Sequence, residues 1–429
     1  MGPGDFESAR SVETSKDEWL RRPTRTKSFE IAVPLRSTKI RVSRDEQLPP
    51  NPSVSLPLPT RDMSLPGRIS LVFGGGGLKG FAHIGVLKAL EERGIRPTVV
   101  AGTSIGALIA AAYAGGMPVA EMERRARALT KPDLFRINHV GMVTRRMLSP
   151  ALYLSRPLEK LIEDIVPAGT FRNFEHRLLV NTIDLEAASQ VLWGLPGLED
   201  VSVREAVYAS CALPGFFPPG KLGGRTCADG GIADNVPALA SSHGMDAVIA
   251  VDVGSSNIAR ARRIADKGFA AIYMRSAQIM MKALQAQQLD HWAGPPLLLV
   301  RPAVWSFHWF SFAHVDRIIQ LGYESAVETL DRVGTSLLLG GVWPRRVVEV
   351  TVDRAACTGC TLCASLAPHM MTIDRDGKAQ VLRSPVEWSR AEGDFVHHCP
   401  TNAIHVHAVN GAERHLTMEM PVMEDGAGP

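Results

Sequence analysis

A serine between two glycines is the first residue of this chain that could act as a nucleophile. Ser104 lies within Gly102-Thr103-Ser104-Ile105-Gly106, after a β-branched run and before a helix of small residues. A serine at a sharp turn from strand to helix needs glycine two positions before it and two after it, because a Cβ there would clash where the two elements meet. Chance alone gives about 0.1 such pentads in a chain of this length. The prediction that Ser104 is a nucleophile therefore depends on its surroundings.

A glycine-rich loop precedes this serine by one predicted helix. The loop reads GGGGLKG from Gly74 to Gly80 and follows the apolar run Ile69 to Phe73. A dinucleotide fingerprint fits formally, but Pro97 to Ser104 lacks the acidic ribose partner, and no Gly-Lys-Ser/Thr completes a Walker phosphate loop. The remaining interpretation of the loop is an oxyanion hole, in which backbone N–H groups point at a developing negative oxygen. The residues predicted for this loop are the donors Gly75, Gly76 and Gly77, with Gly80 in support and with Lys79 either adding positive charge or being an ordinary solvated lysine.

A serine nucleophile also needs a group that accepts its proton. His83 lies among apolar residues of the predicted helix from Phe81 to Arg93, which is typical of a packing histidine rather than a base. Asp229-Gly230-Gly231 would by itself indicate only a turn. An ionised carboxylate can accept the serine proton if the site is partly dry, so we predict a Ser104–Asp229 dyad.

These three motifs resemble, in this order, those of the patatin-like phospholipases. The resemblance covers about Ile69 to Val333 and includes the PGFFPP segment that precedes Asp229. It implies a three-layer α/β fold, Ser104 as nucleophile, Asp229 as its sole partner and lipid acyl esters as substrates. Many members of the family have arginine where this chain has Lys79. The motif-supporting residues are Lys79, Gly80, Gly102, Gly106, Gly230 and Gly231.

Four of the six cysteines crowd the last quarter of the chain, which favours a metal site over a disulfide framework. Two residues separate Cys357 from Cys360 and Cys360 from Cys363, so three thiolates can wrap one corner of a cubane. Cys399 follows far downstream, and the proline after it turns the chain away. Zinc is the alternative, although zinc sites more often use two separated Cys-x-x-Cys pairs.

The segment from Arg346 to Ala408 resembles the bacterial single-cluster ferredoxins, which are small α+β domains. In two-cluster ferredoxins a further cysteine follows the third after a gap of three residues, where this chain has Ala367. We therefore expect one [4Fe–4S] cluster, and Cys360 favours four irons over three. The expected metal ligands are Cys357, Cys360, Cys363 and Cys399.

Composition and charge limit the remaining possibilities. The chain has 429 residues, 45% of them hydrophobic, and a formal net charge of +3, which suits a globular protein of two domains. Its apolar runs are too short to span a bilayer and its start lacks the pattern of a signal peptide, so we expect a cytoplasmic protein. The proline-rich leader carries eight basic residues and one acid between Arg21 and Arg44, and five aromatic residues gather between Trp305 and Phe312. Both could contact a membrane peripherally at its inner face, or be a solvated arm and a loop that covers the core.

The predicted organisation is a flexible basic arm (1–66), a patatin-like domain (67–335), a linker (336–345), a ferredoxin-like domain (346–409) and a disordered tail (410–429). The predicted function is a lipid acyl hydrolase of phospholipase A or lysophospholipase type. Its iron-sulfur domain would have a regulatory, electron-transfer or structural role. The expected partners are a phospholipid or other lipid ester and a redox partner, and no nucleic acid. The alternative is a redox sensor or electron carrier whose larger domain mainly docks lipid.

Overall fold

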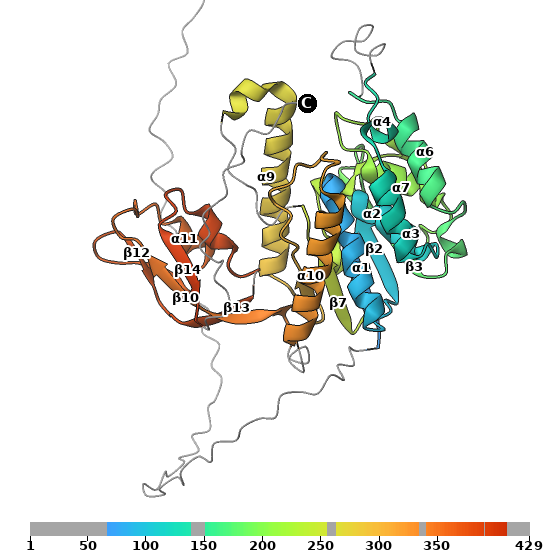
Figure 1. Cartoon of the computed structure of the whole chain (residues 1–429). Coiled ribbons are helices and arrows are strands. Elements are labelled where there is room, and N and C mark those ends of the chain that lie inside the picture. Colours follow the sequence, from blue (N-terminus) through green and yellow to red (C-terminus); the bar gives the residue numbers. More distant parts are fainter. Residues whose placement is uncertain (1–66, 139–150, 255–262, 334–339, 390, 410–429) are drawn as a thin grey trace, which may run out of the picture. The chain divides into compact units, whose positions relative to one another are not determined.

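The computed structural model describes residues 67–138, 151–254, 263–333, 340–389 and 391–409 (Figure 1). The basic arm and the tail predicted from the sequence lie outside these residues. Within the described ranges, no helix is both long enough and apolar enough to cross a membrane.

The larger domain is built on a mixed sheet that has nine strands in the described part of the chain. The strand order is β5-β6-β3-β2-β1-β7-β8-β9, with β4 paired to β3. The central strands β3, β2, β1, β7 and β8 run parallel, whereas β4 and β6 are antiparallel to β3. The strands are β1 (Ile69–Phe73), β2 (Val99–Thr103), β3 (Arg177–Asp184), β4 (Ser189–Trp193), β5 (Gly220–Leu222), β6 (Arg225–Asp229), β7 (Ala247–Val251), β8 (Leu297–Val300) and β9 (Val342–Trp343).

Helices cover both faces of this sheet (Figure 1). The pleat of β1 turns Leu71 and Phe73 toward one hydrophobic cluster and Val72 toward the other, so two cores enclose the sheet. The predicted three-layer α/β fold is confirmed. The helices are α1 (Ala82–Glu92), α2 (Ile105–Ala114), α3 (Val119–Ala128), α4 (Lys131–Leu134), α6 (Arg156–Ile165), α7 (Val203–Cys211), α8 (Ala238–Ser241), α9 (Gly268–Asp290) and α10 (Val315–Val333).

The smaller domain has its own hydrophobic core, which includes Val348, Trp388 and Phe395. Its three-stranded antiparallel sheet has the order β13-β10-β14, and a separate hairpin pairs β11 with β12. Gly377 turns this hairpin with a φ of 72°, as the Asp-Gly pair predicts. The elements are β10 (Arg345–Val352), α11 (Leu362–Leu366), β11 (Met371–Ile373), β12 (Ala379–Val381), β13 (Val386–Ser389) and β14 (Ile404–Ala408).

The junction between the domains differs from the linker predicted at 336–345. Val342 and Trp343 are buried and form β9, which pairs with β8 at the edge of the large sheet. Because β10 begins at Arg345, Pro344 alone separates a strand of the large sheet from a strand of the small one. The sequence Gly-Gly-Val-Trp-Pro predicts a linker because glycine and proline are typical of linkers. Its two apolar residues do not by themselves indicate a strand, since the strand that pairs with them is distant in the chain.

Helices α1 and α10 cross at two glycines, and this contact generates a prediction about stability. A Cβ on Gly85 would overlap the carbonyl oxygen of Ile319, and a Cβ on Gly322 would overlap that of Ala82. Since backbone cannot yield as a flexible side chain can, we expect Gly322→Ala to lower the free energy of unfolding by about 3 kcal/mol. Denaturant unfolding measures this, with Gly67→Ala, which meets open space, as the control. Equal midpoints for G322A and wild type would contradict the packing described here.

Candidate active site

The turn from β2 into α2 holds Ser104 in a strained conformation. Its φ of 56° and ψ of −128° fall in a region that residues other than glycine rarely adopt. A Cβ on Gly102 would collide with the backbone of Gly106, and a Cβ on Gly106 would collide with the carbonyl of Phe73. The backbone N–H of Ser104 donates to Ser210 Oγ at 2.9 Å. The strain is thus maintained by packing and by a hydrogen bond that Ser104 donates to a neighbouring helix.

Asp229 stands at the end of β6 and interacts with the Ser104 hydroxyl. Its carboxyl group is almost fully buried and accepts a hydrogen bond from the Gly231 N–H at 2.9 Å. Burial raises the pKa of Asp229 to about 6, and the bonds from Gly231 and Ser104 only partly offset this increase. A Cβ on Gly230 would lie 2.5 Å from Asn181 Nδ2, which explains the glycine after the aspartate. The structure therefore brings the two predicted dyad residues together.

The three glycines predicted as oxyanion donors differ in the state of their N–H groups. Gly75 donates its N–H to the Asn235 carbonyl at 3.3 Å, while Asn235 Nδ2 donates to the Gly75 carbonyl at 3.1 Å. No hydrogen bond from the N–H of Gly76 or Gly77 to another described residue is observed. Gly77 has a φ of 59° and lines the same cavity as Ser104.

Two titratable side chains are buried here, Lys79 within the loop and His83 in the helix that follows it. Burial lowers the pKa of Lys79 to about 8 in spite of the nearby Asp252 carboxylate, and its Nζ lies 5.8 Å from the centre of the Trp309 ring. The alternative of a solvated lysine is wrong. His83 Nε2 lies 2.8 Å from the Gly74 carbonyl oxygen, and burial lowers the pKa of His83 to about 4. The histidine is neutral at physiological pH and donates to the loop, as expected for a structural histidine.

Gly80, the supporting glycine of the loop, lies against the helix that follows the nucleophile. A Cβ on Gly80 would collide with the side chain of Ile105, the residue after Ser104. The glycine therefore allows the loop and the elbow to touch. Of the predicted supporting residues, Gly80, Gly102, Gly106 and Gly230 are all at such close approaches, and Gly231 packs against the methyl group of Met281.

A cavity of about 770 Å³ opens at the dyad. Ser104 and Asp229 lie in its wall, and most of the other lining residues are apolar, among them side chains of α2, α3, α4 and α6. Cations line part of it, and Arg136 and Lys160 among them are exposed to solvent. Sequence reasoning missed this cavity, because α3 and α6 carry no motif and contribute only their amphipathic faces. The representative apolar lining residues are Ile105, Leu108, Met122, Leu129, Leu158, Leu161 and Phe217.

The aromatic segment from Trp305 to Phe312 covers the core rather than projecting from it. Phe310 packs its ring on that of Phe135 with 5.0 Å between centres, and Phe307 and Phe312 also pack against the large hydrophobic cluster. The Trp309 carbonyl accepts the Leu78 N–H at 2.8 Å. The segment thus closes over the glycine loop, which supports the core-covering interpretation instead of membrane contact.

In the smaller domain, Cys357, Cys360, Cys363 and Cys399 line one small cavity. Backbone N–H groups approach two of the sulfurs, Ala379 N at 3.5 Å from Cys357 Sγ and Ala403 N at 3.2 Å from Cys399 Sγ. Within the described ranges, no three His, Cys, Asp or Glu side chains form a group that could hold a single metal ion. A cubane instead spreads its thiolates over four corners, and N–H groups that point at sulfur are typical of its surroundings. The donor set therefore fits an iron-sulfur cluster.

Comparison with known protein families agrees with both domains. Residues 71–241 match the family model described as patatin-like phospholipase, and residues 350–406 match the model described as 4Fe-4S single cluster domain.

Individual relatives match the larger domain. The chain is 35% identical to mouse patatin-like phospholipase domain-containing protein 6 over 44% of this chain and 14% of that protein. It is 30% identical to the lysophospholipase NTE1 of Coccidioides immitis over 62% of this chain and 18% of the relative. An uncharacterized NTE family protein of Mycobacterium tuberculosis is 34% identical over 46% of this chain and 51% of its own length. The chain thus spans about half or less of these relatives, and it joins a patatin-like phospholipase domain to a 4Fe-4S single cluster domain.

Proposed function

We propose that this protein hydrolyses carboxylic ester bonds of lipids, with Ser104 as nucleophile and Asp229 as general base. The observation that carries the proposal is the position of a strained serine against a buried carboxylate in the wall of an apolar cavity. The match of residues 71–241 to the patatin-like phospholipases supports the same reaction class.

The reaction proceeds in two steps. Ser104 Oγ attacks the ester carbonyl carbon as its proton passes to Asp229, and the N–H groups of Gly76 and Gly77 stabilise the oxyanion that forms. The tetrahedral intermediate collapses, the alcohol leaves with the proton from Asp229, and an acyl-serine remains. Water, deprotonated by Asp229, then attacks this ester. As the second tetrahedral intermediate collapses, Asp229 returns the proton to Ser104 Oγ and the fatty acid is released. Because burial raises its pKa, Asp229 is a stronger base than an ordinary aspartate while it remains ionised at neutral pH.

The cavity favours a long acyl chain as the group bound beside Ser104. A methylene group needs about as much volume as a water molecule in the liquid, roughly 30 Å³, so about 770 Å³ is sufficient for an acyl chain of membrane-lipid length. The exposed cations Arg136 and Lys160 at the cavity would attract a phosphate headgroup. We therefore propose phospholipids or lysophospholipids as substrates, which agrees with the name of the fungal relative.

For the smaller domain we propose one [4Fe–4S] cluster, ligated by Cys357, Cys360, Cys363 and Cys399, that regulates the hydrolase. Ester hydrolysis transfers no electrons, so a catalytic role for the cluster is unnecessary. The cluster domain continues directly from the edge strand β9 through Pro344, which is a short path for a change in one domain to affect the other. An electron-transfer or purely structural role is the competing explanation.

The first prediction concerns the dyad. Ser104→Ala should abolish turnover of a chromogenic ester and labelling by a fluorophosphonate, and Asp229→Asn should lower the rate by about 10²- to 10⁴-fold. Wild-type activity should fall as the pH drops below about 6, because protonated Asp229 cannot accept the serine proton. Ser306→Ala, at an exposed serine outside the cavity, is the control. Normal turnover by S104A or D229N would exclude this mechanism.

The second prediction concerns the cost of keeping Asp229 ionised. The pKa of Asp229 is about 6 in the folded protein and 3.8 for the ordinary group. The free energy of unfolding therefore falls as the pH rises through this interval. Asn keeps an acceptor for the Gly231 N–H but carries no charge. At about pH 8 we expect D229N to be more stable than wild type, on the order of 3 kcal/mol, and the difference to fade toward pH 4.

Asp246→Asn is the matched control for this measurement. Arg68 donates hydrogen bonds to Asp246 and lowers the pKa of that carboxyl group. Loss of the Asp246 charge in the variant should therefore destabilise the protein at neutral pH. Urea unfolding at several pH values gives both results. A D229N variant less stable than wild type at about pH 8 would show that burial does not disfavour the charge.

The third prediction concerns the cluster. Protein purified without oxygen should be brown, and Cys360→Ala should lose this colour or retain only three irons, whereas Cys227→Ala in β6 should keep the wild-type iron content. Esterase activity is then compared in oxidised, dithionite-reduced and air-bleached samples. Equal rates in all three would refute regulation, and zinc in place of iron would refute the cluster itself.

A further inference from the structure

Helix α9, labelled in Figure 1, carries several large apolar side chains that are exposed to solvent. Phe269 is 83% exposed and Met280 is 58% exposed, and both belong to a set of large apolar side chains on one face of the helix. At about 1.5 Å per residue, the set extends for roughly 22 Å along the helix. Its members are Phe269, Ile272, Ile279, Met280 and Leu284.

This outer face carries no charge among the side chains that the structure describes. The other exposed residues of α9 are small or amide residues, and Arg275 and Lys282 are only partly exposed. A helix that only meets water normally places charged residues on its outer side. A contiguous exposed apolar surface of this length marks a site of interaction. The small and amide residues are Gly268, Ser276, Ala283, Gln287 and Gln288.

The opposite face fixes α9 to the catalytic turn. Met281, Gln285 and Leu289 are buried, and the Met281 methyl group lies 2.8 Å from the position of a Cβ on Gly231. Gly231 is the residue whose N–H holds the Asp229 carboxylate. The apolar face is therefore presented by a helix that packs beside the active site.

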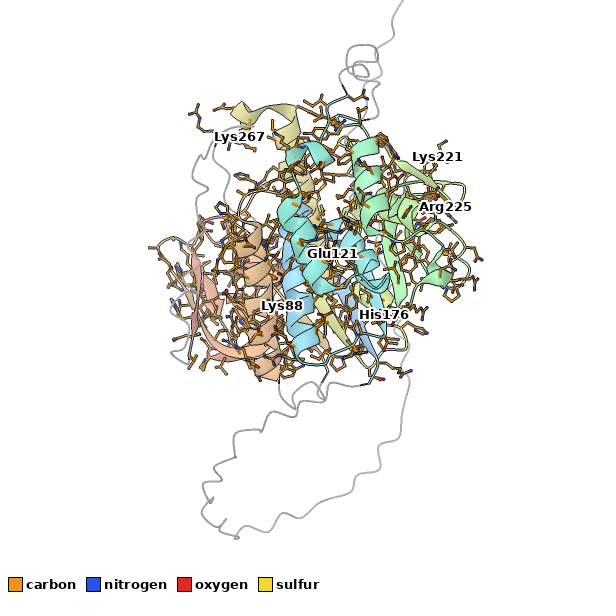
Figure 2. The ribbon with its side chains drawn as sticks, turned by 45° about the vertical axis from the view of Figure 1, so that its right-hand side comes forward. Lys88, Glu121, His176, Lys221, Arg225 and Lys267 are labelled. Carbon is orange, nitrogen blue, oxygen red and sulfur yellow. The ribbon has the colours of Figure 1, made fainter. Side chains whose placement is uncertain are left out.

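The sequence that precedes the helix is basic. The sequence from Ile258 to Lys267 contains four basic residues and one acid, a net charge of +3. Within the described part of the chain, Arg263 and Lys267 are exposed, and Figure 2 shows Lys267 at the edge of the molecule. Arg263 also forms an exposed ion pair with Asp266 at 2.7 Å, which an anionic headgroup would compete with. An apolar face that ends in cations is complementary to a bilayer with anionic headgroups, where apolar side chains enter the boundary of the acyl region.

We propose that the outer face of α9 docks the protein on an anionic lipid surface, with Phe269 and Met280 inserted among the lipids and Arg263 and Lys267 at the headgroups. The choice of a lipid surface, rather than a second protein, rests on the proposed function. A lipid hydrolase must take its substrate from an aggregate, and a helix packed on the Gly231 turn keeps the active site close to it.

Vesicle sedimentation tests the proposal without depending on catalysis. Full-length protein carrying Ser104→Ala is mixed with vesicles of equal parts phosphatidylglycerol and phosphatidylcholine. Phe269→Asp with Met280→Asp should weaken binding about tenfold or more, because two apolar burials are lost. Leu185→Asp with Leu239→Asp changes two exposed leucines elsewhere on the same domain and adds the same charge, so it separates lost insertion from added repulsion.

Two further arms complete the experiment. Phe269→Ser with Met280→Ser should also weaken binding, since the effect is lost apolar contact, and vesicles of phosphatidylcholine alone should bind wild type less. Circular dichroism of each variant confirms that it is folded. Hydrolysis of a soluble short-chain ester by the same variants with Ser104 restored tests the proposed function separately from docking.

The outcomes that would overturn the proposal are distinct. Wild-type protein that ignores anionic vesicles, an unchanged affinity of the two α9 variants, or an equal loss in the leucine control would each exclude docking through this face. Sedimentation velocity gives the competing result: if wild type dimerises and the α9 variants are monomeric with unaltered vesicle binding, the face joins two copies of the chain.

Discussion

The catalytic edge depends on the close approach of three backbone segments at the elbow. Gly102 and Gly106 touch each other across the turn, and Gly106 also lies against the carbonyl of Phe73 at the end of β1. At this contact Ser104 has a positive φ, and the glycine loop that follows β1 lies next to this serine. Any side chain at these glycines would separate β1, β2 and α2, so the geometry of the oxyanion loop and of the nucleophile is determined together.

Hydrogen bonds with three other segments hold the glycine loop in place. His83 bonds the Gly74 carbonyl, Asn235 bonds both polar groups of Gly75, and the Trp309 carbonyl takes the Leu78 N–H. Each bond occupies a group that would otherwise be unpaired inside the protein, where an unpaired amide is costly. Because these bonds leave the N–H groups of Gly76 and Gly77 without a described partner, the loop can offer them to an oxyanion. Lys79, half neutral near pH 8, interacts with the Asp252 carboxylate, and its Nζ lies 5.8 Å from the centre of the Trp309 ring.

Burial disfavours the charged form at both Asp229 and Cys399, but the pKa values of the two groups shift in opposite directions. At Asp229 it raises the pKa and makes a carboxylate a more effective base, at the expense of stability. At Cys399 burial also disfavours the charged form, but hydrogen bonds from Ala403, Thr401 and Ile404 outweigh it and lower the pKa of the thiol. The first environment suits the proton-accepting role proposed for Asp229, and the second suits the role of cluster ligand proposed for Cys399.

The sequence by itself determined the local patterns: the elbow around Ser104, the turn after Asp229, the glycine loop and the cysteine spacing. These are readable because close backbone approach requires glycine and a cluster requires thiolates at short spacing. Only the tertiary structure decided that Asp229 meets Ser104, since β6 reaches the elbow by pairing antiparallel to β3. It also decided that Lys79 is buried, that Trp309 lies on the glycine loop, that Val342 and Trp343 form an edge strand, and that α9 is apolar outside. Those outcomes depend on contacts between residues far apart in the chain. The residues adjacent in sequence do not determine which distant segment packs against a given side chain.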